Sequence, residues 1–499
     1  MTFNNKQNIA IARINSFVGQ NTDKTFYLMG YAGTGKTFLI GKVIKKLLRD
    51  NIMDKIYVCA PTHQALNIIE SYFKINLSEE EQIQFAPKLL FMTIHKLLHF
   101  KPVIMPNDGS KLFKSAKESV FLKQLNNKLI IIDECSMISR DMVQQLQKYT
   151  AFYPIKLIYM GDNMQLPPVG EPESQIFTNI PTNYHYHIVL DEIMRTNSAK
   201  IKDACTIIRT WDKKYNLCKL LLPVHANNES KSKLSSFKMY HKRSDYLNST
   251  WFKNFVKKID QGIVPIMLTW KNVTAAKYNS MIRKYIHKTA NINTYLVGDY
   301  AMFNNYYMSP IDNTCFYTSN MIKINDISTK EKPLFDWAKA LIDKPTNQAE
   351  ILFNSMIKKL AKQKNTFKQD TFMVEKINVD NHQNAPGEST IKTINMEDLI
   401  RYHSMLEDIK QQITHFYAKT KSESLTSKLW NIYHKKLIDP YAEITFGYSI
   451  TVYKAQGSTF HTVFIDIEDM MDNKNNDELQ KALYTAAGRA SNELGLILA

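Results

Sequence analysis

The stretch Phe26-Tyr-Leu-Met-Gly-Tyr-Ala-Gly-Thr-Gly-Lys-Thr37 decides the fold of this chain. Apolar and aromatic residues lead into a glycine-rich loop and Phe38-Leu-Ile40 follow it, which predicts a strand, a loop and a helix. The spacing of Gly30 and Gly35-Lys-Thr37 matches the phosphate-binding pattern G-x-x-x-x-G-K-[ST]. Glycines let backbone amides approach an anion closely, and the positive end of the helix lies at the same place. A chance glycine turn would not explain the complete motif behind a buried strand.

Three side chains in and near this loop receive predicted roles. Lys36 is expected over the β- and γ-phosphates of a nucleotide. The hydroxyl of Thr37 is expected to hold Mg²⁺. Gln7 lies in a predicted short helix just upstream of the loop, and its side-chain amide is a candidate for reading the adenine edge.

Length and composition limit the class of protein. A chain of 499 residues is too long for one ordinary core, so two or more domains are expected. The hydrophobic fraction of 44% and the charged fraction of 22% are typical of a soluble globular protein, and no apolar run is long enough to cross a bilayer. The N-terminus lacks the apolar core of a signal peptide, which predicts an intracellular protein. The five cysteines have no C-x-x-C pairing, which argues against a disulfide framework and a zinc site.

The net charge of +17 favours a polyanionic partner, either a nucleic acid or a membrane surface. No basic amphipathic helix with a lipid-facing apolar side stands out in the sequence, so nucleic acid is preferred. Composition alone does not decide whether the protein binds nucleic acid, because a lysine-rich chain can also reflect a biased genome.

Strands and helices alternate through the first part of the chain. Further buried strands are predicted at Lys55-Ile-Tyr-Val-Cys-Ala60, Leu129-Ile-Ile-Ile132 and Ile155-Lys-Leu-Ile-Tyr-Met160, each followed by polar residues. This alternation predicts a doubly wound parallel sheet. Such sheets bind ligands at the carboxyl edge of their strands, where all of these polar residues would gather.

A second α/β unit is predicted to begin near residue 264 and to resume at residue 442. Residues 300–440 between these parts have no phosphate-type loop and are rich in Lys, Asn and aromatic residues, so an insertion is predicted there. Its later part, from 405 to 438, has apolar residues at helical spacing. Residues 101–114 are predicted to form a hairpin with Asp108-Gly109 at its tip.

A phosphate-binding loop by itself does not activate the attacking water or stabilise the transferring phosphoryl group, and carboxylates and arginines elsewhere in the chain are candidates for these roles. Asp133, at a strand end, can hold Mg²⁺ through water, and the neighbouring Glu134 can orient or deprotonate the attacking water. Gln165 is a candidate sensor of the γ-phosphate. Arg195 and Arg489 are candidate arginine fingers, since both stand beside small or apolar residues rather than in solvated charge runs.

At this point the ordered set of motifs resembles a superfamily 1 helicase. The set begins with Gln7. The matching stretches that follow it are Gly30-Tyr-Ala-Gly-Thr-Gly-Lys-Thr37, Ala60-Pro-Thr-His-Gln-Ala65, Thr93-Ile-His-Lys-Leu-Leu98, Ile132-Asp-Glu-Cys-Ser-Met137, Gly161-Asp-Asn-Met-Gln-Leu-Pro-Pro-Val169, Ile193-Met-Arg195, Tyr453-Lys-Ala-Gln-Gly-Ser-Thr459 and Gly488-Arg-Ala490. More narrowly, the chain is similar to the 5′-to-3′ branch, which includes the RecD-like and phage Dda-type helicases. The matches run from residue 3 to residue 491, in the order of the family.

The resemblance implies an α/β fold with two RecA-like doubly wound parallel-sheet domains and ATP between them. It implies a first domain from residues 1–98 and 121–190 and a second from residues 191–299 and 441–499. It also implies a pin hairpin at 99–120 that splits duplexes, and an SH3-like and helical insertion domain at 300–440. Tyr453 stands where the family usually has His, and Ala487-Gly488 replace the usual Leu and Ser or Thr before the last Arg. Both departures lie in motifs that couple the ATP state to DNA.

The resemblance also assigns site residues, with ATP and Mg²⁺ as cofactors. The ATP-binding residues are Gln7, Gly30, Tyr31, Ala32, Gly33, Thr34, Gly35, Lys36, Thr37 and Gly457. Thr37 and Asp133 are expected to hold Mg²⁺, and the catalytic residues are Lys36, Glu134, Gln165, Arg195 and Arg489. The residues expected to line the nucleic-acid track are Thr62, His63, Thr93, His95, Asn272, Thr451, Tyr453 and Lys454. Taken alone, either histidine is more simply a hydrogen-bonded structural residue.

The implied activity is that of an ATP-dependent DNA helicase, which moves 5′-to-3′ on single-stranded DNA and unwinds duplex during replication, recombination or repair. Expected partners are single-stranded DNA, duplex junctions and replication or recombination proteins, with no membrane. A monomer is expected in the cytoplasm, the nucleoid or a viral replication site. Two alternatives share the motifs, namely a single-strand translocase that displaces bound proteins and an RNA helicase. A non-enzymatic nucleic-acid-binding scaffold is disfavoured by intact Lys36, Asp133, Glu134 and Arg489.

Overall fold

The computed structural model describes the chain apart from residues 1–2, 21–22, 116–127, 179, 181–184, 227–235, 243–244, 290–291, 334–346, 361–365, 379–382 and 499. The chain divides into two compact units, which are described separately. The first unit comprises residues 1–100, 115–276 and 449–499, and the second comprises residues 101–114 and 277–448. The predicted four-part domain division remains a prediction. No helix in the described part of the chain is long and apolar enough to cross a membrane.

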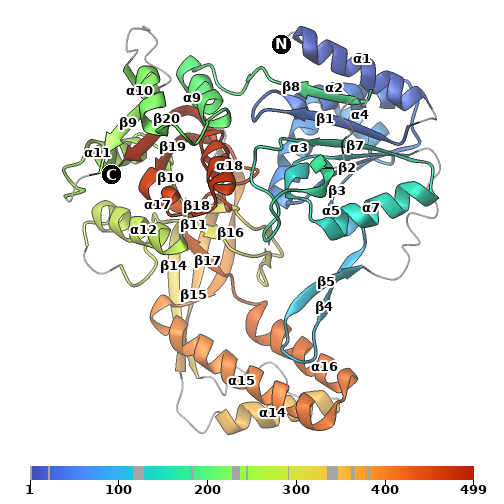
Figure 1. The fold of residues 1–499 in the computed structure, drawn as a ribbon. Coiled ribbons are helices and arrows are strands. Elements are labelled where there is room, and N and C mark those ends of the chain that lie inside the picture. Colours follow the sequence, from blue (N-terminus) through green and yellow to red (C-terminus); the bar gives the residue numbers. More distant parts are fainter. Residues whose placement is uncertain are drawn as a thin grey trace. The chain divides into compact units, whose positions relative to one another are not determined.

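A six-stranded parallel sheet forms the first half of the first unit (Figure 1). Its strands are β1 (Thr25–Gly30), β2 (Lys55–Ala60), β3 (Leu89–Thr93), β6 (Lys128–Ile132), β7 (Ile155–Gly161) and β8 (His187–Leu190), in the order β3-β2-β6-β7-β1-β8. Every described pairing in this sheet is parallel. The crossovers bring the carboxyl ends of β1, β6 and β7 together, as the alternating pattern predicts.

Helices cover both faces of this sheet (Figure 1). They are α1 (Asn5–Gly19), α2 (Lys36–Arg49), α3 (His63–Asn76), α4 (Glu79–Phe85), α5 (Ile94–Leu97), α7 (Arg140–Phe152) and α8 (Gln175–Thr178), with a 3₁₀ turn at Cys135–Met137. Apolar residues of α2, such as Leu39, Val43 and Leu47, recur at helical spacing and are buried with α1 and α3 in one core. The other face of the sheet forms a second core with α5 and α7.

A second, five-stranded parallel sheet completes the first unit. Its strands are β9 (Ser236–His241), β10 (Ile266–Thr269), β18 (Ser449–Thr451), β19 (Phe460–Asp466) and β20 (Ala490–Leu498), in the order β18-β10-β19-β20-β9. Its helices are α9 (Ala199–Arg209), α10 (Leu217–Ala226), α11 (Thr250–Asp260), α17 (Ile467–Met471) and α18 (Asn476–Ala487), and α12 (Asn272–Ile286) continues into the second unit. The two parallel sheets confirm the predicted RecA-like α/β fold class.

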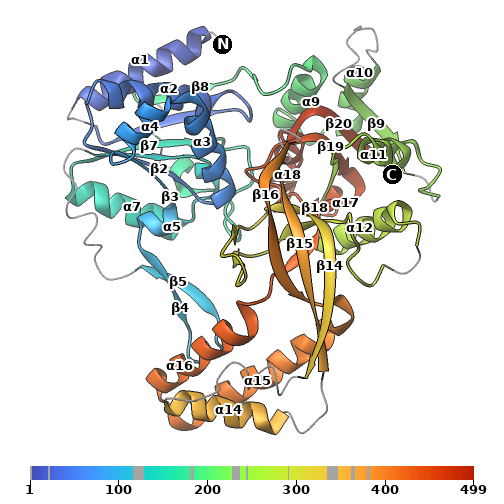
Figure 2. The same ribbon diagram turned by 180° about the vertical axis from the view of Figure 1, so that it is seen from behind.

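The second unit contains the predicted insertion, whose three long antiparallel strands lie side by side in Figure 2. Its sheet has the order β16-β15-β14-β11-β17, from strands β11 (Tyr300–Phe303), β14 (Met321–Pro333), β15 (Thr366–Asn378), β16 (Gln383–Ile394) and β17 (Ile444–Phe446). A small ladder joins β12 (Tyr307–Met308) to β13 (Cys315–Phe316). The helices are α14 (Gln348–Leu360), α15 (Leu399–Thr420) and α16 (Glu423–Tyr433), with short turns at Met396–Asp398 and His434–Ile438. The SH3-like description remains a prediction.

The hairpin belongs to the second unit and is formed by β4 (Phe100–Ile104) and β5 (Lys111–Ser115). Its tip packs on α16. The indole Nε1 of the buried Trp430 donates a hydrogen bond to the carbonyl of Pro106 at 3.0 Å, and a Cβ added to Gly109 would lie 2.5 Å from the indole ring. Residues 116–120 of the predicted pin lie outside the described residues.

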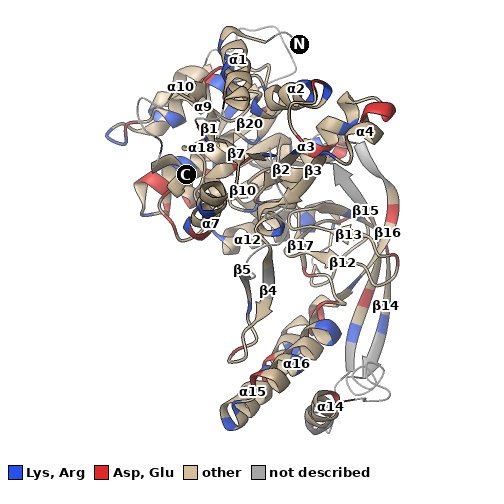
Figure 3. Cartoon of the chain, turned by 90° about the vertical axis from the view of Figure 1, so that its right-hand side faces the viewer, with Lys and Arg blue, Asp and Glu red and all other residues tan. Residues whose placement is uncertain are grey.

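Charge complementarity joins two helices of the first unit. The first turn of α4 carries three glutamates, and the last turn of α2 carries Lys46 and Arg49. Figure 3 shows acidic residues of α4 in red and basic residues of α2 in blue. Glu81 of α4 forms ion pairs with Arg49 and with Lys45, the latter at 2.9 Å. The hydrogen bonds that Lys45 and Arg49 donate to Glu81 lower the pKa of its carboxyl group to about 2. The carboxylate therefore stays ionised where it both caps its own helix and binds its neighbour.

Candidate active site

The phosphate-binding loop lies between β1 and α2 and depends on glycine at several positions. Gly33 and Gly35 have positive φ angles of 79°, which favour glycine. A Cβ on Gly33 would lie 2.5 Å from the Cβ of Arg195, and a Cβ on Gly30 would lie 2.7 Å from the carbonyl oxygen of Leu190. The loop is therefore packed too closely against the 190–195 segment for any side chain at these two positions.

Lys36 folds over the loop. Its ammonium group donates hydrogen bonds to the carbonyl oxygens of Gly30 at 2.7 Å and Tyr31 at 3.0 Å. Burial lowers the pKa of Lys36, while the charges of Asp162, Glu134 and Asp133 act in the opposite direction. The ammonium is thus held at the loop by weak neutral acceptors, which phosphate oxygens can replace with stronger charge-assisted hydrogen bonds.

One carboxylate from the end of β6 faces Thr37. The Thr37 hydroxyl donates to Asp133 Oδ2 at 3.1 Å. Burial and the adjacent charge of Glu134 raise the pKa of Asp133 to about 6. Glu134 itself has φ of 51°, in the left-handed region that few non-glycine residues adopt. The hydroxyl and the carboxylate fit Mg²⁺, a hard cation that prefers oxygen ligands and would relieve the repulsion between the two acidic residues.

Gln7 is buried beside the loop, and its amide bonds within the chain. Its Nε2 donates to the carbonyl of Thr34 at 3.1 Å, and its Oε1 accepts from the backbone N–H of Asn4 at 3.0 Å. The same pair closes a capping box at the start of α1. Gln7 therefore ties α1 to the phosphate-binding loop, and its role toward adenine remains a prediction.

Two arginines from outside the loop lie near it, one shortly after β8 and one immediately before β20. Arg489, immediately before β20, is 1% exposed, and its Nη2 donates to Gln165 Oε1 at 2.9 Å. Burial and the neighbouring Arg195 lower the pKa of Arg489 to about 10. Arg195 donates its Nη1 to the carbonyl of Gly488 at 2.8 Å and its backbone N–H to Gly33 at 2.9 Å. The structure thus brings Arg195, Arg489 and Gln165 together at the junction of the two sheets.

Sequence reasoning missed a second cluster at this junction. Asp162 accepts from Arg209 Nη1 at 2.6 Å and from the Tyr484 hydroxyl at 2.8 Å. The Tyr484 hydroxyl also accepts from the backbone N–H of Ala32 at 2.9 Å, and the Arg209 guanidinium lies 3.8 Å from the ring centroid of Tyr31. Asp162 stands inside a quoted motif, and Tyr484 lies four residues before the motif Gly488-Arg-Ala490, but neither residue was assigned a role. Arg209 lies outside every quoted motif and had no local signal.

The predicted track residues of the first sheet lie together after β2 and β3, which are neighbouring strands. Thr62 and Thr93 each cap the following helix, accepting hydrogen bonds from backbone N–H groups at 3.2 and 3.3 Å. Burial lowers the pKa of His63, with a further contribution from Lys96 and His95, so that a neutral ring is favoured. A Cβ on Gly457 would lie 3.6 Å from the Thr62 hydroxyl oxygen, which places the loop after β18 beside this group.

The remaining predicted track residues lie at the carboxyl end of the second sheet. Thr451 ends β18, and Asn272 begins α12 on the surface. Tyr453 packs against Trp270, with ring centroids 5.7 Å apart, and donates its hydroxyl to Glu478 Oε1 at 2.6 Å. Lys454 is half-buried next to it.

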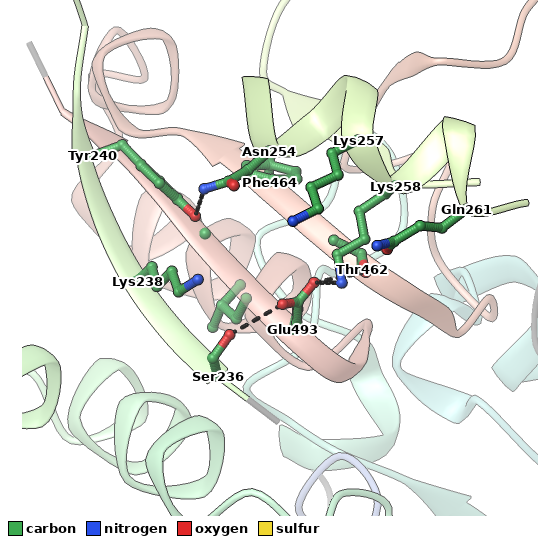
Figure 4. Close-up of a pocket in the computed structure, with 12 residues that line it drawn as sticks. Ser236, Lys238, Tyr240, Asn254, Lys257, Lys258, Gln261, Thr462, Phe464 and Glu493 are labelled. Atoms are coloured by element: carbon green, nitrogen blue, oxygen red, sulfur yellow. Dashed lines mark hydrogen bonds and ion pairs between the residues drawn. The ribbon is translucent and has the colours of Figure 1, made fainter. Parts of the chain in front are cut away.

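A separate pocket of about 150 Å³ lies between α11 and strands β9, β19 and β20 (Figure 4). Lys258 and Glu493 form an ion pair of 2.6 Å within it. None of its lining residues belongs to the predicted site, so it is distinct from the junction that holds the phosphate-binding loop.

Known proteins resemble this chain over part or all of its length. Residues 15–171 match the family described as AAA domain, and residues 446–497 match the UvrD-like helicase C-terminal domain. The uncharacterized protein R530 of Acanthamoeba polyphaga mimivirus is 50% identical over 497 residues, covering 99% of this chain and 100% of that protein.

Two further relatives match shorter regions. The RecBCD enzyme subunit RecD of Buchnera aphidicola is 33% identical over 153 residues, covering 29% of this chain and 23% of that protein. The ATP-dependent DNA helicase PIF1 of Emericella nidulans is 27% identical over 208 residues, covering 37% of this chain and 24% of that protein. These two matches therefore span about a quarter of each relative.

Proposed function

This chain belongs to the superfamily 1 DNA helicases of the RecD and Pif1 type, and we propose that it moves 5′-to-3′ along single-stranded DNA and unwinds duplex DNA by hydrolysing ATP. One observation carries the proposal. Arg489 of the second sheet is buried against Gln165 of the first, at the same junction as the loop that contains Lys36. A nucleotide at this loop would therefore contact both sheets.

ATP with Mg²⁺ would supply the phosphoanhydride bond and the charge neutralisation at this site. Lys36 would exchange its carbonyl acceptors for phosphate oxygens, and Thr37 with Asp133 would hold the metal ion. Glu134 would accept a proton from the attacking water. Arg195 and Arg489 would stabilise the charge that develops on the transferring phosphoryl group.

Movement along DNA would follow from this two-sided contact. If phosphate competes with Gln165 for Arg489, binding and release of nucleotide change the contact between the sheets. The predicted track residues lie on both sheets, at Thr62 and His63 on one and at Thr451 and Tyr453 on the other. If the track residues of the two sheets bind the strand in turn, a change in the distance between them would move the strand along the protein. Basic side chains would give affinity independent of sequence.

Two alternatives share this chemistry. A translocase that displaces bound proteins would need no duplex separation, and an RNA helicase would use the same loop. The Emericella nidulans relative is an ATP-dependent DNA helicase by name, which favours DNA. The mimivirus relative favours action inside an infected cell, in viral DNA replication, recombination or repair. We expect a monomer to be active, with replication or recombination proteins as further partners.

The deciding experiment compares duplexes that carry a 5′ or a 3′ single-stranded tail. We expect ATP-dependent unwinding of the 5′-tailed duplex only, with no unwinding by Lys36→Ala. Unwinding of the 3′-tailed duplex alone would reverse the polarity. Displacement of streptavidin from a biotinylated strand without unwinding would favour the translocase, and a preference for RNA strands would favour the RNA helicase. The absence of any nucleic-acid-stimulated ATP hydrolysis would refute the function as a whole.

A further inference from the structure

The hydrogen bond between Tyr453 and Glu478 joins the predicted nucleic-acid track on the second sheet to helix α18. Its length is 2.6 Å, and its acceptor is a carboxylate in the first turn of the helix. Asn473 donates to the other oxygen of Glu478 at 3.3 Å, and Trp270 packs against the Tyr453 ring. Burial and Glu478 raise the pKa of Tyr453, so the hydroxyl stays a donor. Charge-assisted hydrogen bonds of this kind are about twice as strong as neutral ones.

Helix α18 then leads from this bond to the candidate ATP site. It spans 12 residues, or about 18 Å at 1.5 Å per residue. Its last turn holds Tyr484, whose hydroxyl bonds Asp162 and the loop amide of Ala32. Arg489 follows two residues after its end. A displacement of the first turn therefore moves groups that contact the phosphate-binding loop, because the helix transmits it as a rigid element.

A second attachment keeps α18 aligned with α9. The buried Gln480 directs its Nε2 toward the carbonyl oxygens of Ile208, Arg209 and Trp211, at 3.0, 3.0 and 3.1 Å. These carbonyl groups lie at and just after the carboxyl end of α9, where Arg209 forms an ion pair with Asp162. The two helices thus present Tyr484 and Arg209 to the same carboxylate as one body.

We propose that Glu478 is a positioning residue that couples nucleic-acid binding at Tyr453 to ATP hydrolysis through helix α18. The inference rests on the proposed function, because it requires that nucleic acid stimulate the ATPase. It also accounts for Tyr453 at a position where the family usually has His. A phenol reaches Glu478 while its ring stays packed on Trp270, so the link is made in a form particular to this chain.

The test compares Glu478→Ala with Asp477→Ala. Both residues are acidic, occupy the first turn of α18 and interact with the helix dipole, but Asp477 pairs with Lys213 rather than with Tyr453. ATP hydrolysis is measured without nucleic acid and across a titration of single-stranded DNA. We expect Glu478→Ala to lower the maximal stimulation by about tenfold, as the loss of a hydrogen bond to a charged group would do, and to leave the unstimulated kcat and KM unchanged. Asp477→Ala is expected to match the unaltered protein.

A conservative variant and a double-mutant cycle separate coupling from simple loss of structure. Glu478→Gln keeps an acceptor for the Tyr453 hydroxyl and should restore most of the stimulation. Tyr453→Phe should lower the stimulation, and adding it to Glu478→Ala should cause no further loss, since both remove the same bond.

Several results would overturn the inference. One is that Glu478→Ala and Asp477→Ala show the same maximal stimulation of ATP hydrolysis. Another is that Glu478→Ala lowers the unstimulated and the stimulated rates equally. The third is that the losses of stimulation add up in the variant that combines Tyr453→Phe with Glu478→Ala. Each of these leaves the proposed function intact, since the unaltered protein still hydrolyses ATP faster with DNA. If the unaltered protein shows no stimulation by nucleic acid, the proposed function fails and the coupling fails with it.

Discussion

The chemistry of single residues is tested most directly at Glu134, the candidate base beside the raised-pKa carboxyl of Asp133. Glu134→Gln keeps the shape of the side chain and removes its basicity. We expect kcat to fall by about a hundredfold to ten-thousandfold while ATP still binds. Steady-state ATP hydrolysis and the binding of a fluorescent nucleotide measure the two effects, and Lys36→Ala, which should lose binding as well, is the comparison. Turnover close to normal in Glu134→Gln would remove the residue from this role.

The arginine fingers make a different prediction, because their geometry matters more than their charge. The guanidinium of Arg489 donates to Gln165, Ser458 and Thr485, a fork that lysine cannot reproduce. We expect Arg489→Lys and Arg195→Lys each to lower kcat by about a hundredfold or more with little change in ATP affinity. Single-turnover hydrolysis beside equilibrium nucleotide binding would measure this. A collapse of ATP affinity with unchanged kcat would contradict the finger assignment.

At this scale, local sequence predicted some residues and not others. Two short motifs with fixed spacing contain Lys36, Thr37 and Asp133. These residues lie close together because the strands before the two motifs end at the same edge of the first sheet. Arg209 and Tyr484 reach Asp162 only through the packing of α9 and α18 across the junction. No pattern near either residue encodes that meeting, which depends on tertiary packing.

Among the elements, the pairing of α4 with α2 predicts a pH-dependent stability. The pKa of Glu81 is lowered to about 2 by Lys45 and Arg49, below the value of about 4.5 expected for the unfolded chain. Its stabilisation is therefore complete above about pH 4.5 and is lost as the pH falls toward about 2. We expect Glu81→Gln to lower the urea midpoint at neutral pH and to match the unaltered protein progressively in acid. Glu79→Gln, in the same helical turn, is the control, and equal effects of the two variants at neutral pH would contradict the assignment.

The hairpin yields the second prediction at this scale. Gly109 has φ of 69° and faces Trp430, whereas Gly298 has φ of 90° and has no neighbouring atom within 4 Å of an added Cβ. Both substitutions to Ala carry a backbone cost of about 1–2 kcal/mol, but only Gly109→Ala also forces the hairpin away from α16. If the hairpin separates strands, Gly109→Ala should reduce duplex unwinding and spare DNA-stimulated ATP hydrolysis, and Gly298→Ala should do neither.

Duplex unwinding measured beside streptavidin displacement from a biotinylated single strand distinguishes the outcomes. Equal loss in both assays, or no loss in either, would count against the pin. The hairpin itself was predictable from its turn and prolines. Its docking on Trp430 was not, because the partner lies far along the chain in an insertion without recognisable motifs.

For the whole molecule, the net charge of +17 predicts that binding to single-stranded DNA depends steeply on salt. Each phosphate neutralised contributes a slope of about −0.7 to the plot of log affinity against log salt. We expect a linear plot, and Lys454→Ala should reduce the slope by about 0.7, as the loss of one phosphate contact. Fluorescence anisotropy with a labelled oligonucleotide measures this. An unchanged slope in Lys454→Ala would remove that residue from the track.

The order of the strands has a further consequence for how the protein is made. The second sheet needs β9 and β10 from the middle of the chain and β18, β19 and β20 from its last 51 residues. In the described ladder β9 pairs with β20, which ends at Leu498. On a ribosome β9 and β10 must therefore wait for their partner strands until residues 449–498 have been synthesised. A premature stop even in the last turn of α18 would leave β9 without a neighbour and the junction without Arg489. The second sheet would thus be completed only in chains that have been translated through Leu498.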